Sequence, residues 1–183
     1  MKAFLLTPWL FSFLLGSSLS YGTACSDLAA TAPQGIQLTT QRYLPDGQSL
    51  TSYCLVKGQT DQRIGVDGKP YVLKFELRLP DYWQGRFAYQ FNDGNDGNVK
   101  PAVGKVTGLL PEQYAINRGF AVLSSNGGHD AEPISVAGLA GAALFGRDPQ
   151  ARRDYGYDAV RKLYPVARVL IQNYYRSPIR YSY

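Results

Sequence analysis

The chain has 183 residues, of which 45% are hydrophobic and 18% are charged, and this composition excludes an intrinsically disordered protein. The net charge is +5, and Lys2 is the only charged residue before Cys25, so removal of that segment lowers the charge to +4. The basic residues are scattered, and no run exceeds the pair Arg152-Arg153. Nucleic-acid-binding proteins concentrate positive charge on one face. We therefore expect no nucleic-acid partner.

Residues 1–24 have the pattern of a secretory signal peptide. Lys2 supplies a short positive region, residues 3–15 are almost entirely apolar, and small residues suited to cleavage follow. The apolar run is shorter than the roughly 20 residues that span a bilayer, so an uncleaved anchor is the less favoured alternative. We expect cleavage between Ser20 and Cys25, a secreted or periplasmic protein, and no membrane span.

Two cysteines, Cys25 and Cys54, are present. In an oxidising compartment, an even count without Cys-x-x-Cys spacing favours one disulfide bond over a metal site. Two unpaired thiols remain the alternative. Cleavage after Ala24 would also allow lipid attachment to Cys25, which would consume its sulfur and exclude the disulfide. However, Gly22 stands where a lipobox prefers leucine or a similar residue.

Three patterns describe the first half of the mature chain. Residues 25–53 are polar with turn signals and predict loops with little regular structure. The tight-turn signature at 65–68 predicts a strand on each side. Residues 71–79 alternate between apolar and polar side chains, which predicts a half-buried strand that ends at Pro80.

The second half alternates between strand and helix patterns. Residues 85–91 and 119–125 predict strands. Residues 111–118 and 152–176 predict helices, and Pro165 should kink or split the second one. Pro178 should stop that helix, and a further strand should begin in the last residues of the chain. This alternation predicts an α/β sheet with parallel strands.

Two loops rich in Gly, Asn and Asp, 92–98 and 126–130, follow the predicted strands. In α/β sheets the loops at the carboxyl ends of strands form the functional site, although ordinary solvated turns have the same composition. His129 lies in the second loop and is the single histidine. It could serve as a general base, but we favour a structural hydrogen-bonding role because no nucleophile is placed to use it.

Motifs of known chemistry do not occur within the chain. Ser124 and Ser125 lack the preceding glycine of a nucleophile elbow, and no His-Glu-x-x-His, Walker A or Gly-x-Gly-x-x-Gly motif is present. Asp93, Asp96 and Asp130 could bind a cation, but a solvated loop is the better interpretation, so we expect no metal site. The C-terminal tyrosines suit a helix–sheet boundary with hydroxyl groups at its rim.

Several segments together resemble the tannase/feruloyl esterase family of secreted α/β-hydrolases. The matching segments are 54–58, 71–80, 83–87, 92–98, 119–122, 127–129, 145–152 and 154–157. The resemblance extends over nearly all of residues 25–183. It implies the fold class α/β, as the N-terminal part of an α/β-hydrolase sheet truncated just before the nucleophile elbow. Residues 25–183 would then be an incomplete hydrolase domain that follows a signal peptide at 1–24.

Family members continue from a Ser-Tyr pair, here Ser182-Tyr183, into a Gly-Cys-Ser-x-Gly-Gly elbow that carries the nucleophile. The resemblance therefore implies that the catalytic Ser, Asp and His all lie beyond Tyr183 and that this chain alone is inactive. The calcium site of the family would lie in a lid domain that is also beyond this segment, so we expect no cofactor here.

One role implied by the resemblance falls inside the chain. Gly94 would donate its backbone N–H to the oxyanion hole, although residues 91–93 stand where the family often has glycines. Asp93 and His129 would support the site without touching the substrate, since His129 matches a family Gly-His and not the catalytic histidine. Cys25 and Cys54 resemble the N-terminal disulfide of the family.

The sequence thus predicts the N-terminal fragment of a secreted serine carboxylic-ester hydrolase. Its small-molecule substrates would be esters of aromatic acids, of the gallate, ferulate or terephthalate monoester type. An exported, non-catalytic binding module with a tyrosine-rich surface is the alternative.

Overall fold

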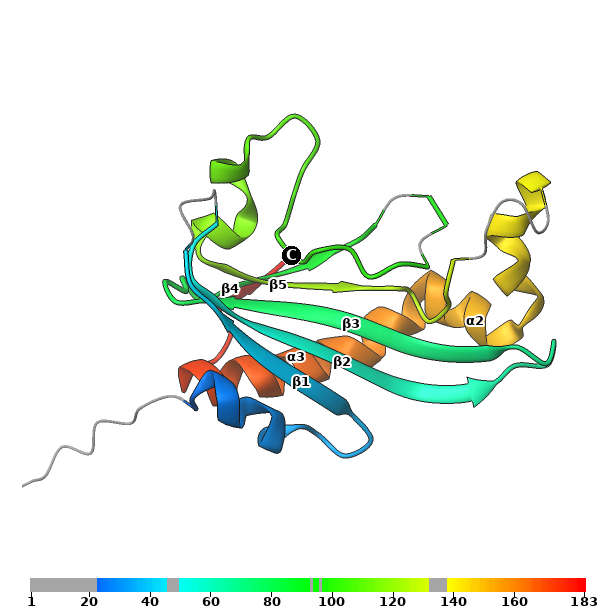
Figure 1. Ribbon diagram of the computed structural model, residues 1–183, viewed down its shortest axis with the longest axis horizontal. Helices are drawn as coiled ribbons and strands as arrows, with labels where there is room; N and C mark the ends of the chain where they lie inside the picture. The colour runs from blue at the N-terminus through cyan, green and yellow to red at the C-terminus, as the bar shows by residue number, and fades with distance from the viewer. Residues whose placement is uncertain (1–22, 46–49, 93, 96, 132–137) are drawn as a thin grey trace, which may run out of the picture.

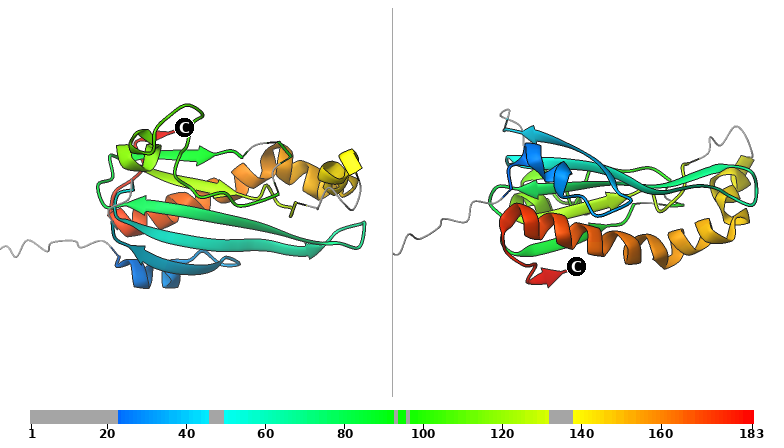
Figure 2. Two further views of the ribbon diagram at one scale, coloured as in Figure 1. Left: turned by 45° about the horizontal axis from the view of Figure 1, so that its top comes forward. Right: turned by 90° about the horizontal axis from the view of Figure 1, so that it is seen from below.

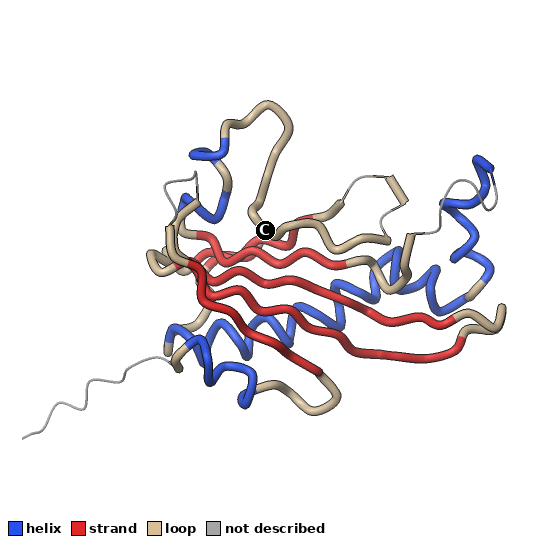
Figure 3. The backbone as a smooth tube through the Cα atoms, in the orientation of Figure 1, coloured by secondary structure: helices blue, strands red, loops and turns tan. Residues whose placement is uncertain are grey.

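A computed structural model describes residues 23–45, 50–92, 94–95, 97–131 and 138–183, with six strands in one sheet (Figures 1 and 3). The strands are β1 (Gln37–Tyr43), β2 (Tyr53–Ile64), β3 (Pro70–Pro80), β4 (Arg86–Gln90), β5 (Phe120–Ser125) and β6 (Tyr181–Ser182). The α-helices are α2 (Pro149–Arg153) and α3 (Ala159–Tyr175), and a π-helical turn, η5 (Asp154–Asp158), joins them. The 3-10 helices are η1 (Cys25–Thr31), η2 (Pro111–Gln113), η3 (Ala115–Arg118) and η4 (Gly138–Arg147).

The sheet is mixed, with the strand order β1-β2-β3-β5-β4-β6. Strand β4 pairs in parallel with β5 and β6, as predicted for an α/β sheet. The pairs β1–β2, β2–β3 and β3–β5 are antiparallel, so the expectation of a parallel sheet is wrong for this half. For the pair β2–β3 the reason is the turn at 65–68, in which Gly68 N–H donates to Gly65 O at 3.0 Å. Such a tight turn joins antiparallel strands, whereas parallel strands need a long crossover.

The main hydrophobic core lies between the sheet and α3, which runs along one face (Figure 2). The apolar side chains of β3 that were predicted to share a face are all buried: Tyr71, Leu73, Phe75, Leu77 and Leu79. The opposite face is not fully exposed, because Glu76 and Arg78 are buried there. The segment 101–118 covers them, and Glu76 Oε1 accepts from Ala102 N–H at 2.8 Å. The predicted half-buried strand is therefore buried on both faces towards its end.

Residues 25–53 contain more regular structure than predicted. Helix η1 buries Leu28 in the main core, and β1 pairs with β2 over its whole length. The expectation of loops failed because β1 is a largely exposed edge strand, stabilised by main-chain hydrogen bonds that leave no strong apolar alternation. A Cys25–Cys54 disulfide ties η1 to β2, which confirms the predicted bond and leaves neither thiol free.

The long C-terminal helix is confirmed with three differences. It starts at Pro149, contains the π-helical turn η5, and runs through Pro165 without splitting. Pro165 faces solvent. Because it has no N–H, the carbonyl four residues earlier lacks its helical partner, and water can hydrogen-bond to this carbonyl instead. The predicted helix at 111–118 is two 3-10 turns instead, because Tyr114 between them is extended with ψ 149°.

The predicted signal peptide lies almost wholly outside the described residues, which begin at Thr23. Its cleavage stays a prediction. Within the described part of the chain, no helix combines the length and apolar character needed to cross a bilayer.

Candidate functional site

Two loops meet at the carboxyl edge of the parallel pair β4 and β5. Gly97, in the loop after β4, donates its N–H to Asn126 O at 3.2 Å and accepts from Ala131 N–H at 2.8 Å. Gly97 has φ +85°, and a Cβ there would lie 2.6 Å from the backbone nitrogen of Ala131. Only glycine permits this close approach, so the sequence pattern of the loop fixes its contact with the loop after β5.

In both loops, asparagine side chains form hydrogen bonds with main-chain N–H and C=O groups. Asn126 is buried, and its Oδ1 accepts from Lys74 N–H at 2.9 Å and from Gly128 N–H at 3.1 Å. Asn92 donates through Nδ2 to Ser125 O at 2.7 Å and to Asn98 O at 2.9 Å. Asn92 and Asn126 therefore connect the two predicted loops to the sheet edge, which is more than a solvated turn would do.

His129, in the loop after β5, is buried, with 2% of its surface exposed. Its Nε2 lies 2.8 Å from Asn95 O, and because a carbonyl only accepts hydrogen bonds, Nε2 carries the proton. The ring stacks on Phe145, with centroids 3.6 Å apart and planes 14° apart. This arrangement suits a structural role and leaves Nε2 unable to accept a proton as a base. Its predicted support of a catalytic site is a separate matter that stays a prediction.

Gly94 is exposed in the loop after β4 and has φ +64°. Among the described atoms, nothing lies within 4 Å of where its Cβ would be. Tyr155 Oη donates to Gly94 O at 3.2 Å. The predicted oxyanion role of Gly94 stays a prediction, and Asp93, its predicted supporting neighbour, lies outside the described residues.

The serines at the end of β5 are engaged in structural contacts. Ser124 and Ser125 are both buried. Ser124 Oγ donates to Asn92 Oδ1 at 3.3 Å, and Ser125 Oγ lies 2.7 Å from Tyr89 Oη. Buried hydroxyl groups in such contacts cannot meet a substrate, which agrees with the absence of an elbow motif around them.

The acidic residues near the loops serve as ion-pair partners where the structure describes them. Asp130 forms an ion pair with Lys74 at 2.7 Å. Asp93 and Asp96, the other two candidate cation ligands, lie outside the described residues. Across the described ranges, no three His, Cys, Asp or Glu residues come together as a metal site.

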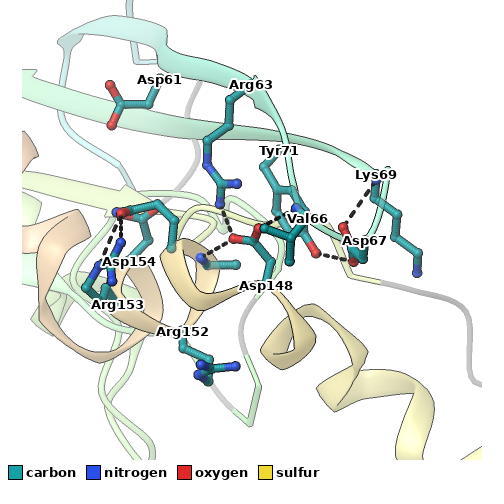
Figure 4. A network of polar contacts seen from close by, with 12 residues as sticks. Asp61, Arg63, Val66, Asp67, Lys69, Tyr71, Asp148, Arg152, Arg153 and Asp154 are labelled. Carbon is teal, nitrogen blue, oxygen red and sulfur yellow. Dashed lines mark hydrogen bonds and ion pairs between the residues drawn. The ribbon is translucent and has the colours of Figure 1, made fainter.

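A polar network anchors the tip of the β2–β3 hairpin to the start of α2 (Figure 4). Asp148 Oδ1 accepts from Arg63 at 2.6 Å and from Ala151 N–H at 2.7 Å, and Oδ2 accepts from Val66 N–H at 3.0 Å. These donors, Arg63 first, hold the pKa of Asp148 well below its ordinary value despite burial. Asp148 lies in the matching segment 145–152 but was given no role, although Asp148-Pro149 is the expected signal of a helix N-terminus.

A second buried carboxylate connects the helix to the loop after β5. Asp154, in η5, accepts from Lys162 Nζ at 2.7 Å, and Lys162 also forms an ion pair with Asp61 at 2.6 Å. Gly128 packs so closely on Asp154 that a Cβ there would lie 2.6 Å from the Asp154 Cβ, and its φ is +87°. The hairpin tip, the helix and the Gly127-Gly128 turn are therefore held together.

The family model for tannase and feruloyl esterase matches residues 54–183. The chain belongs to this family. It is 34% identical over 135 residues to mono(2-hydroxyethyl) terephthalate hydrolase of Piscinibacter sakaiensis. The aligned region covers 74% of this chain and 22% of that protein. It is 30% identical over 108 residues to probable feruloyl esterase B-2 of Aspergillus flavus, covering 59% of this chain and 18% of that protein.

Solved structures share the fold. An esterase from Aspergillus oryzae superimposes with a TM-score of 0.64 at 18% identity, over 87% of this chain and 31% of that chain. Feruloyl esterase B from the same organism gives a TM-score of 0.59 at 19% identity, over 87% of this chain and 30% of that chain. The chain thus spans less than a third of the length of each of these relatives.

Proposed function

We propose that this chain forms the N-terminal part of the catalytic domain of an exported serine carboxylic-ester hydrolase that acts on esters of aromatic acids. The pairing of β6 with β4 carries the proposal. Tyr89 N–H donates to Tyr183 O at 2.9 Å, and Tyr183 N–H donates to Phe87 O at 3.0 Å. The carboxyl end of β6 therefore lies beside the strand that leads into the Gly94 loop.

This arrangement supports the roles that the family implies for the nucleophilic serine and for the oxyanion donor Gly94. A nucleophilic serine in an elbow that follows Ser182-Tyr183 would emerge next to the loop after β4. Chain segments that follow adjacent parallel strands emerge at the same edge of the sheet. The serine would attack the ester carbonyl, a histidine would take its proton, and an aspartate would orient that histidine. Gly94 N–H would stabilise the negative charge that develops on the carbonyl oxygen.

The proposed substrates are gallate, ferulate or terephthalate monoester types, as the names of the relatives suggest. The confirmed disulfide supports export, since such bonds persist in oxidising compartments. The calcium site implied by the family would lie in the lid domain, which is not among residues 1–183.

The test begins with the coding frame beyond codon 183. The frame is expected to encode Gly-Cys-Ser-x-Gly-Gly a few residues on, and the full product should hydrolyse methyl ferulate, methyl gallate or a terephthalate monoester. Replacing the elbow serine by alanine should abolish this activity in a protein that still folds. A folded product that carries the elbow but hydrolyses none of these esters would overturn the proposal. A stop directly after Tyr183 would favour an exported binding module.

A further inference from the structure

Two consecutive carbonyl groups of the loop after β4 are each held by a side chain from elsewhere in the fold. Tyr155 Oη donates to Gly94 O at 3.2 Å, and His129 Nε2 donates to Asn95 O at 2.8 Å. Both donors lie more than 30 residues further along the chain, at sequence separations of 61 and 34. The orientation of two neighbouring peptide groups therefore depends on two distant residues.

The two donors belong to one aromatic cluster, which consists of His129, Phe145 and Tyr155. The ring centroids of His129 and Phe145 are 3.6 Å apart, and those of Phe145 and Tyr155 are 5.2 Å apart. His129 also meets the Tyr155 ring edge-on at 6.0 Å. Because each ring packs against the other two, the positions of the two donor atoms are linked.

The π-helical turn η5 sets the position of Tyr155. Its neighbour Asp154 is buried and bonded to Lys162 and Gln150, which fixes this turn on the helix. Asp154 also packs on Gly128, next to His129. Tyr155 is 44% exposed and reaches over the loop after β4. Single π-helical turns within helices occur frequently at functional sites, where they redirect a side chain.

We propose that Tyr155 is a positioning residue for the oxyanion hole, acting with His129 through the loop after β4. The inference rests on the proposed function and deepens it. By holding Gly94 O, the Tyr155 hydroxyl fixes the peptide group that follows Gly94. His129 fixes the next peptide group. With the chain on its carboxyl side held in this way, Gly94 has fewer conformations to lose when its N–H meets the substrate, which lowers the reorganisation required during the reaction.

The test uses Tyr155→Phe in the full-length protein, because this change removes the hydroxyl and keeps the ring in the cluster. The matched control is Tyr157→Phe, which changes an exposed tyrosine of the same π-helical turn. With an aromatic methyl ester as substrate, Tyr155→Phe should lower kcat about tenfold with KM changed less than twofold, because a small misplacement acts on the transition state. Tyr157→Phe should change neither constant by more than about twofold.

A second measurement does not depend on activity. Amide hydrogen exchange of the full-length protein should be faster at residues 92–98 in Tyr155→Phe than in the wild type, and unchanged in Tyr157→Phe. If Tyr155→Phe matches Tyr157→Phe in both kcat and exchange, the proposal is overturned. If the wild type hydrolyses no ester, the catalytic role falls with the proposed function, while exchange at 92–98 still decides whether Tyr155 holds the loop.

Discussion

Arg63 and Asp148, which are 85 residues apart in sequence, form an ion pair with 2.6 Å between Nη2 and Oδ1. The Asp148 side chain is 2% exposed and Arg63 is 25% exposed. Because the same carboxylate caps α2 through Ala151 N–H, one side chain connects the hairpin tip to the helix that carries Tyr155. The contact between the hairpin tip and this helix therefore depends on a charged group.

We expect Asp148→Asn to lower the free energy of unfolding by about 1.5–3 kcal/mol at pH 7, the range of hydrogen bonds to charged groups. The pKa of Asp148 is depressed in the folded chain, so its stabilisation is fully present above the unfolded-state pKa of about 3.9. It is lost as the pH falls towards the folded-state pKa. The difference between wild type and variant should therefore shrink below about pH 4.

Urea unfolding from pH 7 to pH 3 measures this difference. Glu112→Gln, which removes an exposed carboxylate from η2, is the control for the loss of one negative charge. A stability difference for Asp148→Asn that stays constant down to pH 3 would contradict the assignment.

The Cys25–Cys54 bond closes a loop with a sequence separation of 29. In the chain-entropy model, a loop of this size stabilises a fold by about 3–4 kcal/mol. Replacing both cysteines by serine should lower the free energy of unfolding by about this amount, because η1 would lose its covalent tie to β2. Denaturant unfolding checks the value, and reduction of the wild type should reproduce it. Equal stability of oxidised and reduced protein would show that η1 is held by packing alone.

The sequence predicted the elements whose side chains alternate or repeat strongly. Strands β3 and β5 and the long C-terminal helix were found because their apolar periodicity reflects direct burial. Strand β1 was missed because an edge strand is stabilised through its backbone, which leaves little trace in side-chain type. The burial of Glu76 and Arg78 was missed for a related reason, since it depends on the segment 101–118 folding back over them.

The candidate site was likewise predicted only in part from the sequence. The loops after β4 and β5 were identified from their Gly and Asn content and their place after strands. Their contact through Gly97 and Asn126 could not be predicted, because it depends on the adjacent positions of β4 and β5 in the sheet. The role of Tyr155 depends further on the π-helical turn, and no local pattern of residues 154–158 distinguishes that turn from an α-helix.

Because α3 is continuous through Pro165, replacing this proline should stabilise the folded chain. Pro165→Ala would restore a main-chain hydrogen bond on the exposed face of α3, worth up to about 3 kcal/mol in helix propensity. Greater freedom of the unfolded chain offsets about 0.4–1 kcal/mol of this gain. We therefore expect the free energy of unfolding to rise by up to about 2–2.6 kcal/mol in urea titrations. Val169→Ala, on the same helix and 41% exposed, should change it by no more than about 0.5 kcal/mol. A destabilised Pro165→Ala would show that the proline ring packs on a neighbour.

Gly94 and Gly68 provide a matched pair for testing the oxyanion hole. Both have positive φ, +64° and +77°, and among the described atoms neither has a neighbour within 4 Å of the position that a Cβ would occupy. Valine at either position should therefore cost a similar strain of about 1–2 kcal/mol in stability.

Of the two glycines, only Gly94 lies in the loop beside β6. In the full-length protein, Gly94→Val should lower kcat by roughly 10²-fold, the effect of one lost oxyanion donor, because the strained backbone turns its N–H away. Gly68→Val, at the distant hairpin tip, should leave kcat within about twofold. Steady-state kinetics of the two variants, with circular dichroism to show that both fold, decides the matter. A folded Gly94→Val enzyme with unchanged kcat would mean that the oxyanion donor is another backbone N–H.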